Sequence, residues 1–352
     1  MSRPRTRMAD IAALAGVSTA TVSRVVSGSG QVSGETRHKV LVALDSLGYE
    51  RPNAERPGNS SAIAVITPEL VNPIFALYAH SMQAEITRAG FLPLVCTQTP
   101  GGTSEEQYVR SLLDHGVAGI VFVSGRHADY RADISRYASL AASGVPFVTV
   151  NGARAEVPAP DFSTGDAMGI EAAVHHLVQL GHRRIALLGG HTHIVPAARK
   201  AEAFQQVMGR ELGDTDPLVT ETFYTYEAAA SATRGLVEAG TTAIVAGSDL
   251  QALGAARTIH TMGLRVPEDV SLVGFDDSML MGHLDPPLTT VRQPVQAITT
   301  AAVRALTSME PGSRQEHQAY VYTPDLVVRG STGQAPERAG SDPRPRGSRT
   351  PV

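Results

Sequence analysis

The chain has 352 residues, a hydrophobic fraction of 42% and a formal net charge of −4. This length is enough for a small module and a body of one or two larger domains, each with its own core. No apolar run approaches the ~20 residues of a membrane span, and the N-terminal arginines precede no apolar signal core. The single cysteine, Cys96, excludes an internal disulfide. We therefore expect a globular cytoplasmic protein with no membrane partner.

The charge is unevenly distributed. Residues 1–57 hold eight basic and five acidic side chains, so this end carries +3 and the remainder −7. A cationic end on an acidic body indicates that only the end meets a polyanion.

Residues Met8–Val26 carry apolar side chains at helical spacing, interrupted at Gly16-Val17-Ser18. Gly16 can end one helix in the left-handed conformation, and Ser18 can cap the next. This pattern predicts a helix-turn-helix whose second helix can enter a DNA major groove. That helix carries short outward side chains followed by a long cation, Arg24, which can fork onto a guanine. An αα-hairpin buried in a helical core is the alternative at this point.

A third helix is predicted over Gly34–Leu47. Val32 and Ser33 are typical of the hydrophobic staple and the N-cap that precede a helix, and Gly48 is typical of the residue that ends one. The three helices can close a small core, which would be marginal without DNA or a partner copy. The expected core residues are Ile11, Leu14, Val22, Val40 and Leu44.

From Ala62 onward, short apolar runs alternate with amphipathic stretches. The predicted strands are Ala62–Thr67, Leu92–Cys96, Gly119–Ser124, Phe147–Asn151, Ile185–Gly189, Leu218–Thr222, Ala243–Ala246 and Ser271–Phe275. The predicted helices include Ile74–Ala89, Glu105–His115, Met168–Leu180, Arg199–Arg210, Glu227–Ala239 and Leu250–Met262. This alternation predicts two doubly wound, parallel-sheet α/β subdomains with a ligand cleft at the carboxyl ends of the strands.

The first 50 residues resemble the DNA-binding head of the lactose-repressor/galactose-repressor family of bacterial transcription regulators. The matching segments are D-I-A-A-L-A-G-V-S-T-A-T-V-S-R-V, V-S-G-E-T-R-H-K-V and L-G-Y. The resemblance implies that Thr19, Ala20 and Arg24 read bases. It also implies that DNA phosphates are held by Ser18, Thr21, Ser23, Ser27 and Thr36, and that DNA is contacted from the hinge by Asn53.

The body resembles the sugar-sensing core of the same family, whose fold is that of periplasmic sugar-binding proteins. The likeness runs from I-A-V-I-T-P through L-G-H-R-R-I-A-L-L-G-G, G-F-D-D and D-P-P-L-T-T-V-R-Q-P to D-L-V-V-R-G-S. It implies a head over 1–50, a linker over 51–61 and a two-lobed core over 62–331. Residues 332–352 are rich in glycine, proline, serine and arginine, and we expect them to form a disordered tail. Lobe 1 is expected over about 62–151 and 291–318, and lobe 2 over about 152–290 and 319–331.

The linker departs from the family pattern. It has one extra residue before Pro52-Asn53, about four fewer afterwards, and no leucine between Tyr49 and Ile63. Pro57-Gly58 would also break a helix starting at Asn53. Either this protein lacks the family's minor-groove leucine and binds a less kinked operator, or the linker is a tether that orders only on DNA.

Candidate effector ligands follow the predicted strands. Asp276 could accept hydrogen bonds from sugar hydroxyls, and Arg199 could donate paired hydrogen bonds from its planar guanidinium. Both residues match effector positions of the family. The alternative is that the two form an ion pair that braces the loops. Phe75 offers an apolar platform for a sugar face, while Asn72 and Asp166 could equally be helix caps. The full candidate set is Asn72, Phe75, Asp166, Arg199, Ser248, Asp276 and Gln293.

Two family positions have lost polar groups, at Gly165-Asp166 and Ser248-Asp249, which indicates an effector smaller or less hydroxylated than a disaccharide. The histidines near His191-Thr192-His193 have no carboxylate or cysteine at ligand spacing, so we expect no metal. No phosphate-cradling loop, nucleophile elbow or catalytic acid pair is present, so we expect no cofactor and no enzyme.

The sequence therefore predicts a ligand-responsive transcription regulator, a repressor that binds a pseudopalindromic DNA operator as a homodimer. Its effector would be a small molecule, expected to be a sugar. The alternatives are a sugar-binding receptor without a DNA role and, more distantly, an enzyme of Rossmann type.

Overall fold

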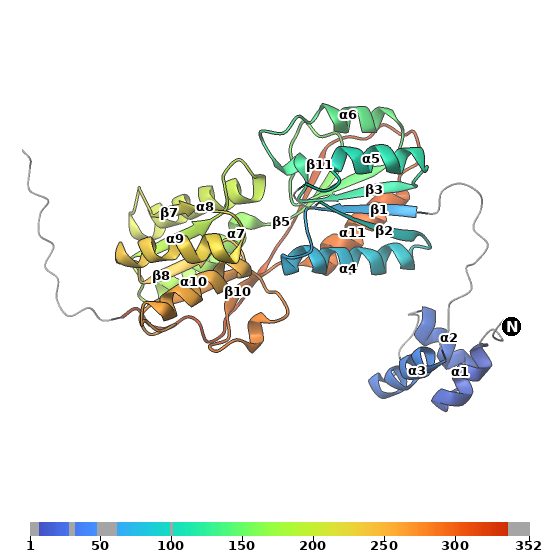
Figure 1. Ribbon diagram of the computed structural model, residues 1–352, viewed down its shortest axis with the longest axis horizontal. Helices are drawn as coiled ribbons and strands as arrows, with labels where there is room; N and C mark the ends of the chain where they lie inside the picture. The colour runs from blue at the N-terminus through green and yellow to red at the C-terminus, as the bar shows by residue number, and fades with distance from the viewer. Residues whose placement is uncertain (1–6, 28–31, 48–61, 99–100, 337–352) are drawn as a thin grey trace, which may run out of the picture. The chain divides into compact units, whose positions relative to one another are not determined.

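The computed structural model describes residues 7–27, 32–47, 62–98 and 101–336. The chain forms two compact units, Met1–Gly58 and Asn59–Val352, which we call the head and the body (Figure 1). The predicted linker over 51–61, with Asn53, lies outside the described residues. No single helix within them is long and apolar enough to cross a membrane; by length and composition alone, only the bent pair Met8–Ala15 and Thr19–Val26 could.

The head contains three helices, α1 (Met8–Ala15), α2 (Thr19–Ser27) and α3 (Gly34–Ser46). Gly16 ends α1 in the left-handed conformation, with φ 65°. Ser18 Oγ accepts a hydrogen bond from the Thr21 amide at 3.1 Å, and Ser33 Oγ accepts one from the Thr36 amide at 3.3 Å. These two side-chain caps are those that the sequence predicted.

The head core is built around the fully buried Ile11, Val22 and Val40, and Leu44 packs against it. Leu14 was expected in this core, but 55% of its surface is exposed. The inner face of α1 is instead occupied by Ala12 and Ala15 beside Ile11. Because Ala12 and Ala15 are small, α1 can pack closely against the other two helices, and the position of Leu14 lies outside this packed face.

The first sheet of the body has the strand order β11-β5-β4-β3-β1-β2, and all its pairs are parallel. Its strands are β1 (Ala62–Thr67), β2 (Leu92–Thr97), β3 (Gly119–Val123), β4 (Phe147–Val150), β5 (Pro160–Thr164) and β11 (Gln318–Tyr322). Its helices are α4 (Pro73–Arg88), α5 (Glu105–Asp114), α6 (Ser135–Ala142) and α11 (Val295–Ser308). Side chains alternate across β1: Ile63 and Val65 meet α4 and α11, whereas Ala64 and Ile66 meet α5 and α6.

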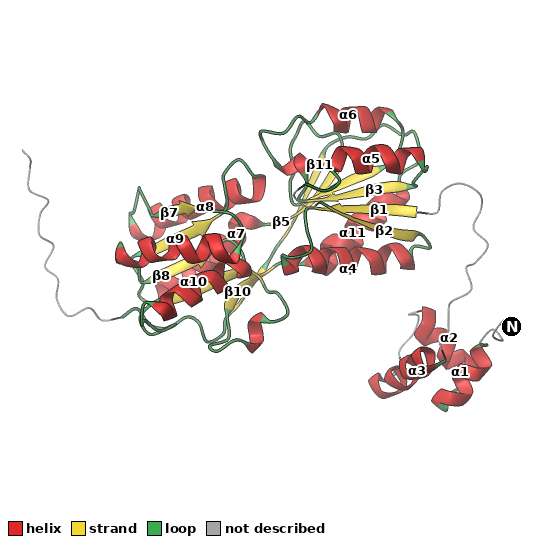
Figure 2. Cartoon of the chain, in the orientation of Figure 1, coloured by secondary structure: helices red, strands yellow, loops and turns green. Residues whose placement is uncertain are grey.

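The second sheet has the order β12-β10-β9-β8-β6-β7. Its strands are β6 (Ile185–Gly189), β7 (Val219–Glu221), β8 (Ala243–Ala246), β9 (Ser271–Asp276), β10 (Thr289–Arg292) and β12 (Asp325–Val327), the last antiparallel to β10. Helices α7 (Asp166–Gln179) and α8 (Val195–Leu212) cover one face, and α9 (Tyr226–Glu238) and α10 (Asp249–Thr261) cover the other (Figure 2). Both halves are therefore doubly wound, as predicted.

The chain crosses between the sheets three times, after β5, after β10 and between β11 and β12. We define lobe 1 as residues 62–164 and 294–322, and lobe 2 as residues 165–292 and 325–336. The predicted lobe boundaries at 152, 291 and 319 are wrong, because β5 and β11 complete the first sheet and β10 belongs to the second. β5 reads Pro-Asp-Phe-Ser-Thr, which lacks the apolar run by which a buried strand is detected in sequence.

The predicted disordered tail begins too early. The Ala335 amide donates to the Leu180 carbonyl at 2.8 Å, and the Gly333 amide donates to Ser271 Oγ at 3.0 Å. The buried side chain of His182 contacts the Gly333 carbonyl at 3.1 Å. Residues 332–336 are therefore fastened to lobe 2, and residues 337–352 lie outside the described part of the chain.

Candidate functional site

The outward face of α2 is polar and made of short side chains. Thr19, Ala20, Ser23 and Arg24 are exposed and Thr21 is partly exposed, whereas the inward Val22 and Val25 are buried. A helix with this face can approach the base edges of a major groove closely.

The other predicted DNA contacts that the structure describes lie at the ends of α2 and at the start of α3. The Ser18 and Thr21 hydroxyls lie 2.9 Å apart at the start of α2, and the Thr36 hydroxyl accepts from Ser33 at the start of α3. Ser27 is the last residue of α2, and Asn53 lies outside the described residues. Helix starts present backbone N–H groups and hydroxyls that suit phosphate oxygens.

A cavity of about 250 Å³ lies between the two lobes. Both sheets contribute the carboxyl ends of their strands, which is where open α/β folds bind ligands. The cavity is lined by Pro68, Glu69, Asn72, Ile74, Phe75, Ser124, Asn151, Asp166, Ile194, Pro196, Lys200, Tyr224, Gly247, Ser248, Asp276 and Gln293. The predicted effector residues are thus brought together, with the exception of Arg199.

Four non-glycine residues of the described chain have positive φ angles, and all four follow or end a strand beside this cavity. They are Ser124 (45°), Asn151 (58°), Asp276 (125°) and Asp277 (56°). Such strained conformations persist where the surrounding structure holds them, and they cluster at functional sites.

Asn72 and Ser248 each cap a helix while lining the cavity. Asn72 Oδ1 accepts from the Ile74 amide at 3.4 Å, and Ser248 Oγ accepts from the Gln251 amide at 3.2 Å. Asp166 is not a cap, because it is the first residue of α7 and Gly165 holds the N-cap position. Its carboxylate pairs instead with Lys200 Nζ at 3.0 Å.

Lys200, and not Arg199, presents the cation of α8 to the cavity. Arg199 Nη2 donates to the Ala153 carbonyl at 3.1 Å, whereas Lys200 Nζ lies 4.0 Å from the centre of the Phe275 ring. The prediction for Arg199 is therefore off by one position, a turn of about 100° on a helix. Burial lowers the pKa of Lys200, but the attractions of Asp166, Tyr224 and Asp276 together outweigh it, so the pKa is raised and the ammonium stays charged.

Gln293, on the second crossover, joins groups from both lobes. Its Oε1 accepts from Tyr78 Oη at 3.0 Å, from Thr164 Oγ1 at 2.8 Å and from Asn151 Nδ2 at 3.4 Å, all in lobe 1. Its Nε2 donates to Asp276 Oδ1 at 2.6 Å, in lobe 2. Burial, with repulsion from Asp249, raises the pKa of Asp276 well above its ordinary value.

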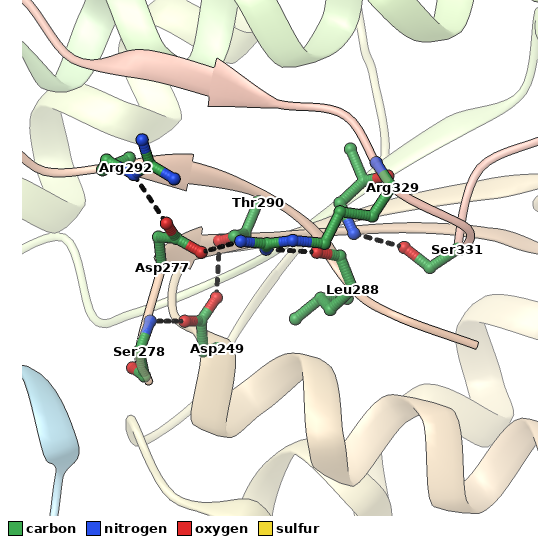
Figure 3. A network of polar contacts seen from close by, with 9 residues as sticks. Asp249, Asp277, Ser278, Leu288, Thr290, Arg292, Arg329 and Ser331 are labelled. Carbon is green, nitrogen blue, oxygen red and sulfur yellow. Dashed lines mark hydrogen bonds and ion pairs between the residues drawn. The ribbon is translucent and has the colours of Figure 1, made fainter. Parts of the chain in front are cut away.

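A second polar cluster, around Asp249 and Asp277, holds the chain at the end of β9 (Figure 3). Asp277 lies between Arg292 Nε and Arg329 Nη2, each 2.6 Å away. Asp249 accepts from the Ser278 amide at 2.7 Å and from Thr290 Oγ1 at 2.6 Å, and burial raises its pKa to about 6. These contacts fix the strained backbone that presents Asp276 to the cavity.

The lobes also meet at one side of the cavity, in a contact that we call the interlobe bridge. Asp129 of lobe 1 and Ile194 of lobe 2 form an isolated antiparallel bridge. The Tyr130 amide donates to the His193 carbonyl at 2.8 Å, and Arg131 contacts the His193 ring. His191 lies 3.4 Å from Glu221, and no cluster of three metal-ligating side chains occurs in the described part of the chain.

Sequence reasoning missed five polar residues that line the cavity, which are Glu69, Ser124, Asn151, Lys200 and Tyr224. Ser124 and Asn151 are the last residues of two predicted strands, so the rule that ligands meet carboxyl ends of strands could have found them. Lys200 adjoins the residue that was chosen. Tyr224 lies in the loop between β7 and α9, where no sequence signal marks it.

Two segments of the chain match known protein families. Residues 7–53 match the family described as bacterial regulatory proteins, lacI family, and residues 174–332 match the periplasmic binding protein-like domain. HTH-type transcriptional regulator MalR of Streptomyces coelicolor is 49% identical over 340 residues, covering 95% of this chain and 99% of that relative. HTH-type transcriptional repressor CytR of Escherichia coli is 29% identical over 336 residues, covering 94% and 97%.

Solved structures show the same likeness over nearly the whole chain. A complex of the transcriptional regulator CelR with cellobiose aligns with a TM-score of 0.68 at 29% identity, covering 93% of this chain and 100% of that one. The lac repressor dimer bound to operator and the anti-inducer ONPF aligns with a TM-score of 0.66 at 26% identity, covering 94% and 100%.

A helix-turn-helix head joined to a two-lobed body with a cavity between its lobes defines a class of ligand-responsive DNA-binding regulators. The chain belongs to the LacI family of bacterial regulatory proteins, and it is a DNA-binding transcription regulator. This assignment is favoured over the alternative of a sugar-binding receptor without a DNA role, because MalR and CytR, which match 95% and 94% of the chain, are transcription regulators.

Proposed function

We propose that the chain is a cytoplasmic repressor that binds a pseudopalindromic operator as a homodimer and responds to a small sugar held between its lobes. The observation that carries the proposal is the set of hydrogen-bonding side chains that both sheets direct into one cavity. One head reads only a half-site, so a two-fold dimer is needed to read both halves of a palindrome.

The chemistry of the cavity suits a polyhydroxylated ligand. Asp276 offers a carboxylate, and Asn151 and Gln293 offer amides, which together can accept from and donate to several hydroxyl groups. Phe75 and Ile194 supply apolar surface for the face of a sugar ring. The cellobiose complex of CelR, a relative in fold and sequence, supports a sugar as the class of effector.

Exposed apolar side chains near the cavity support dimer formation. Val71, which precedes α4, is 81% exposed and Leu77, on α4, is 39% exposed. Met279 and Leu280, after β9, are 86% and 65% exposed. Large apolar side chains exposed to this degree are typical of an interaction surface when they form a patch. The lac repressor dimer supports the same assignment.

A groove of about 500 Å³, which includes Leu77, lies next to the effector cavity. Leu77 and Ser81 of α4 line the groove together with the start of α11, and Asp276 and Gln293 line both the groove and the cavity. A sugar that changes the hydrogen bonds of these two residues would therefore act on the packing of α4. The effector can shift the operator-binding state only by as much as it prefers one lobe arrangement over the other.

The test is operator binding in the presence of candidate sugars. DNA from the protein's own promoter would be titrated with full-length protein by fluorescence anisotropy, with and without mono- and disaccharides, and light scattering would give the mass in solution. We expect a dimer that prefers its promoter over scrambled DNA and an affinity that changes with one of the sugars. A folded head with no sequence preference at low ionic strength would contradict the proposal.

A further inference from the structure

Arg199, on α8 of lobe 2, contacts lobe 1 directly. Its Nη2 donates to the carbonyl of Ala153, in the loop between β4 and β5, at 3.1 Å. Arg199 does not line the effector cavity, whereas its neighbour Lys200 does. Because the donor and the acceptor belong to different lobes, this hydrogen bond is lost whenever the lobes move apart. The contact therefore links Arg199 to the arrangement of the lobes.

A buried carboxylate of lobe 1 holds the loop that Arg199 contacts. Asp161, on β5, accepts from the Gly152 amide at 3.3 Å and from Thr149 Oγ1 at 2.8 Å. Burial raises the pKa of Asp161, and the attraction of Arg199 is one of the interactions that oppose this rise. The guanidinium thus acts across the lobes on a carbonyl and on a buried carboxylate, in surroundings where charge interactions are weakly screened.

The start of the same helix meets lobe 1 at a second point. Ile194, the N-cap residue of α8, forms the antiparallel bridge with Asp129. Arg154, which follows Ala153, donates from Nη1 to the Asp129 carbonyl at 2.8 Å. The two lobe 1 loops that α8 contacts are thus tied to each other by Arg154. The contacts made by Ile194 and Arg199 therefore belong to one connected unit.

This unit adjoins the residues of α8 that face the effector cavity. Ile194, Pro196 and Lys200 line the cavity, and Arg199 directly precedes Lys200. Rigid helices carry energetic coupling between sites, so a ligand that draws the start of α8 toward lobe 1 also brings Arg199 to the Ala153 carbonyl. A residue that contacts only the opposite lobe changes the balance between open and closed lobes without touching the effector.

We propose that Arg199 is a positioning residue for lobe closure, because its guanidinium holds α8 against the Ala153 loop and so stabilises the closed arrangement. This inference rests on the proposed function of the cavity as an effector site. Since Arg199 acts on the lobes and not on the ligand, its loss should be measurable in the unliganded protein. With effector, the loss should weaken binding of every sugar by a similar factor.

The experiment compares full-length wild type with Arg199→Met and Arg199→Lys, which keeps the charge but not the planar donor group. Arg210→Met is the matched control, because Arg210 lies on the same helix and pairs with Glu171 and Glu211, both in lobe 2. Hydrogen exchange followed by mass spectrometry reports on the interlobe bridge, where the Tyr130 amide donates to the His193 carbonyl. Calorimetry with D-ribose, D-glucose, maltose and cellobiose gives the Kd values.

The Tyr130 amide of unliganded Arg199→Met should exchange at least about threefold faster than that of wild type, because the bridge opens more often. Kd should rise about 3- to 20-fold for each sugar that wild type binds, in line with the loss of one hydrogen bond from a charged donor. The ratios of Kd between sugars should stay within about twofold of wild type. Arg199→Lys should fall between wild type and Arg199→Met, and Arg210→Met should match wild type.

The outcomes separate this inference from the function on which it rests. If wild type binds a sugar and Arg199→Met keeps both the exchange rate and the Kd, Arg199 has no role in closure and the proposed function stands. Altered ratios between sugars with unaltered exchange would make Arg199 an effector contact and overturn the inference. If wild type binds no sugar of the panel, the proposed class of effector fails, and the exchange rates still decide the role of Arg199. Arg199→Lys carries the test if Arg199→Met does not fold.

Discussion

Gln293 Nε2 donates to Asp276 Oδ1 at 2.6 Å, and in doing so joins a crossover segment to the end of a lobe 2 strand. The oxygen of the same amide accepts from three lobe 1 donors. Among uncharged side chains, only the amides of asparagine and glutamine combine an oxygen that accepts hydrogen bonds with an NH2 group that can donate two. One side chain thus makes the hydrogen bonding of each lobe depend on the position of the other.

Replacing this amide should destabilise the body and weaken effector binding together. Gln293→Met keeps the length of the side chain but leaves Asp276 and the lobe 1 donors without their partner, for an expected loss of about 1–3 kcal/mol in the free energy of unfolding. Urea denaturation measures that loss, and calorimetry should show at least a tenfold rise in Kd for the effector. Gln206→Met, an exposed change on α8, is the control; equal behaviour of the two variants would contradict the assignment.

Effector affinity should rise with pH. Burial and the neighbouring Asp249 raise the pKa of Asp276, so part of the unliganded protein carries a protonated carboxyl at a pH where a free aspartate is ionised. A sugar that donates hydroxyls to the carboxylate must first displace that proton, so binding strengthens as the pH rises through the pKa. Calorimetry from pH 5.5 to 8.5 in buffers of different ionisation enthalpy would show proton release on binding. Asp276→Asn should bind more weakly and with a flat pH profile, and a wild-type profile that is already flat would exclude this role.

Several of these features were predictable from the sequence only in part, for reasons that particular residues make clear. The turn at Gly16 and the caps Ser18 and Ser33 were predictable because they depend on local chemistry, a positive φ and a hydroxyl one turn from an amide. The strands with continuous apolar runs were predictable because both their faces are buried.

What the sequence could not supply depends on contacts between distant segments. β5 contains aspartate, serine and threonine, and half of β10 is threonine. Both segments are strands because neighbouring strands hold them. The place of Lys200 in the cavity depends on which face of α8 is turned toward the cavity. The place of the Tyr224 ring depends on Gly190 and Gly247, which are 34 and 23 positions away in the chain. Only the fold brings these groups together.

His127 should make stability depend on pH. It is fully buried in lobe 1, and burial lowers its pKa from 6.5 to about 4. Between these values the unfolded chain binds a proton that the native state does not, so stability falls as the pH falls, by roughly 3 kcal/mol in total at about 1.4 kcal/mol per pKa unit. The contribution is fully present above pH 6.5.

The measurement is urea denaturation at pH 7 and pH 5 for wild type, His127→Gln and the exposed control His80→Gln. Burial also lowers the pKa values of His176 and His182, so these residues also reduce stability at low pH, and they do so in all three proteins. His127→Gln should therefore lose less stability between the two pH values than wild type does, even if its stability at pH 7 is lower. An unchanged difference would show that His127 is not the titrating group.

Weakening the support of the interlobe bridge should make the lobes open more easily. Arg154 Nη1 donates to the Asp129 carbonyl at 2.8 Å, and its guanidinium lies 5.6 Å from the centre of the Tyr130 ring. Arg154→Met removes both interactions from the loop that meets Ile194. We expect a larger radius of gyration in solution scattering without effector and a 3- to 10-fold faster release of effector, about 1 kcal/mol of lost closure. Arg110→Met, an exposed change on α5, should leave both quantities at their wild-type values; a release rate unaltered by Arg154→Met would remove the bridge from the mechanism.

Arg24 should carry sequence discrimination on DNA. It is exposed on the outward face of α2, one turn beyond the short side chains Thr19 and Ala20. A bidentate arginine–guanine contact is worth about 1–3 kcal/mol of discrimination against the wrong base, so Arg24→Ala should reduce the ratio of operator to scrambled-DNA affinity about 5- to 150-fold. Binding to scrambled DNA should fall far less, because phosphate contacts supply most of it. Anisotropy titrations at two salt concentrations, with Arg234→Ala on α9 of the body as the control, measure the ratio. An Arg24→Ala protein that keeps its thermal stability and its full operator preference would show that other residues of α2 read the bases.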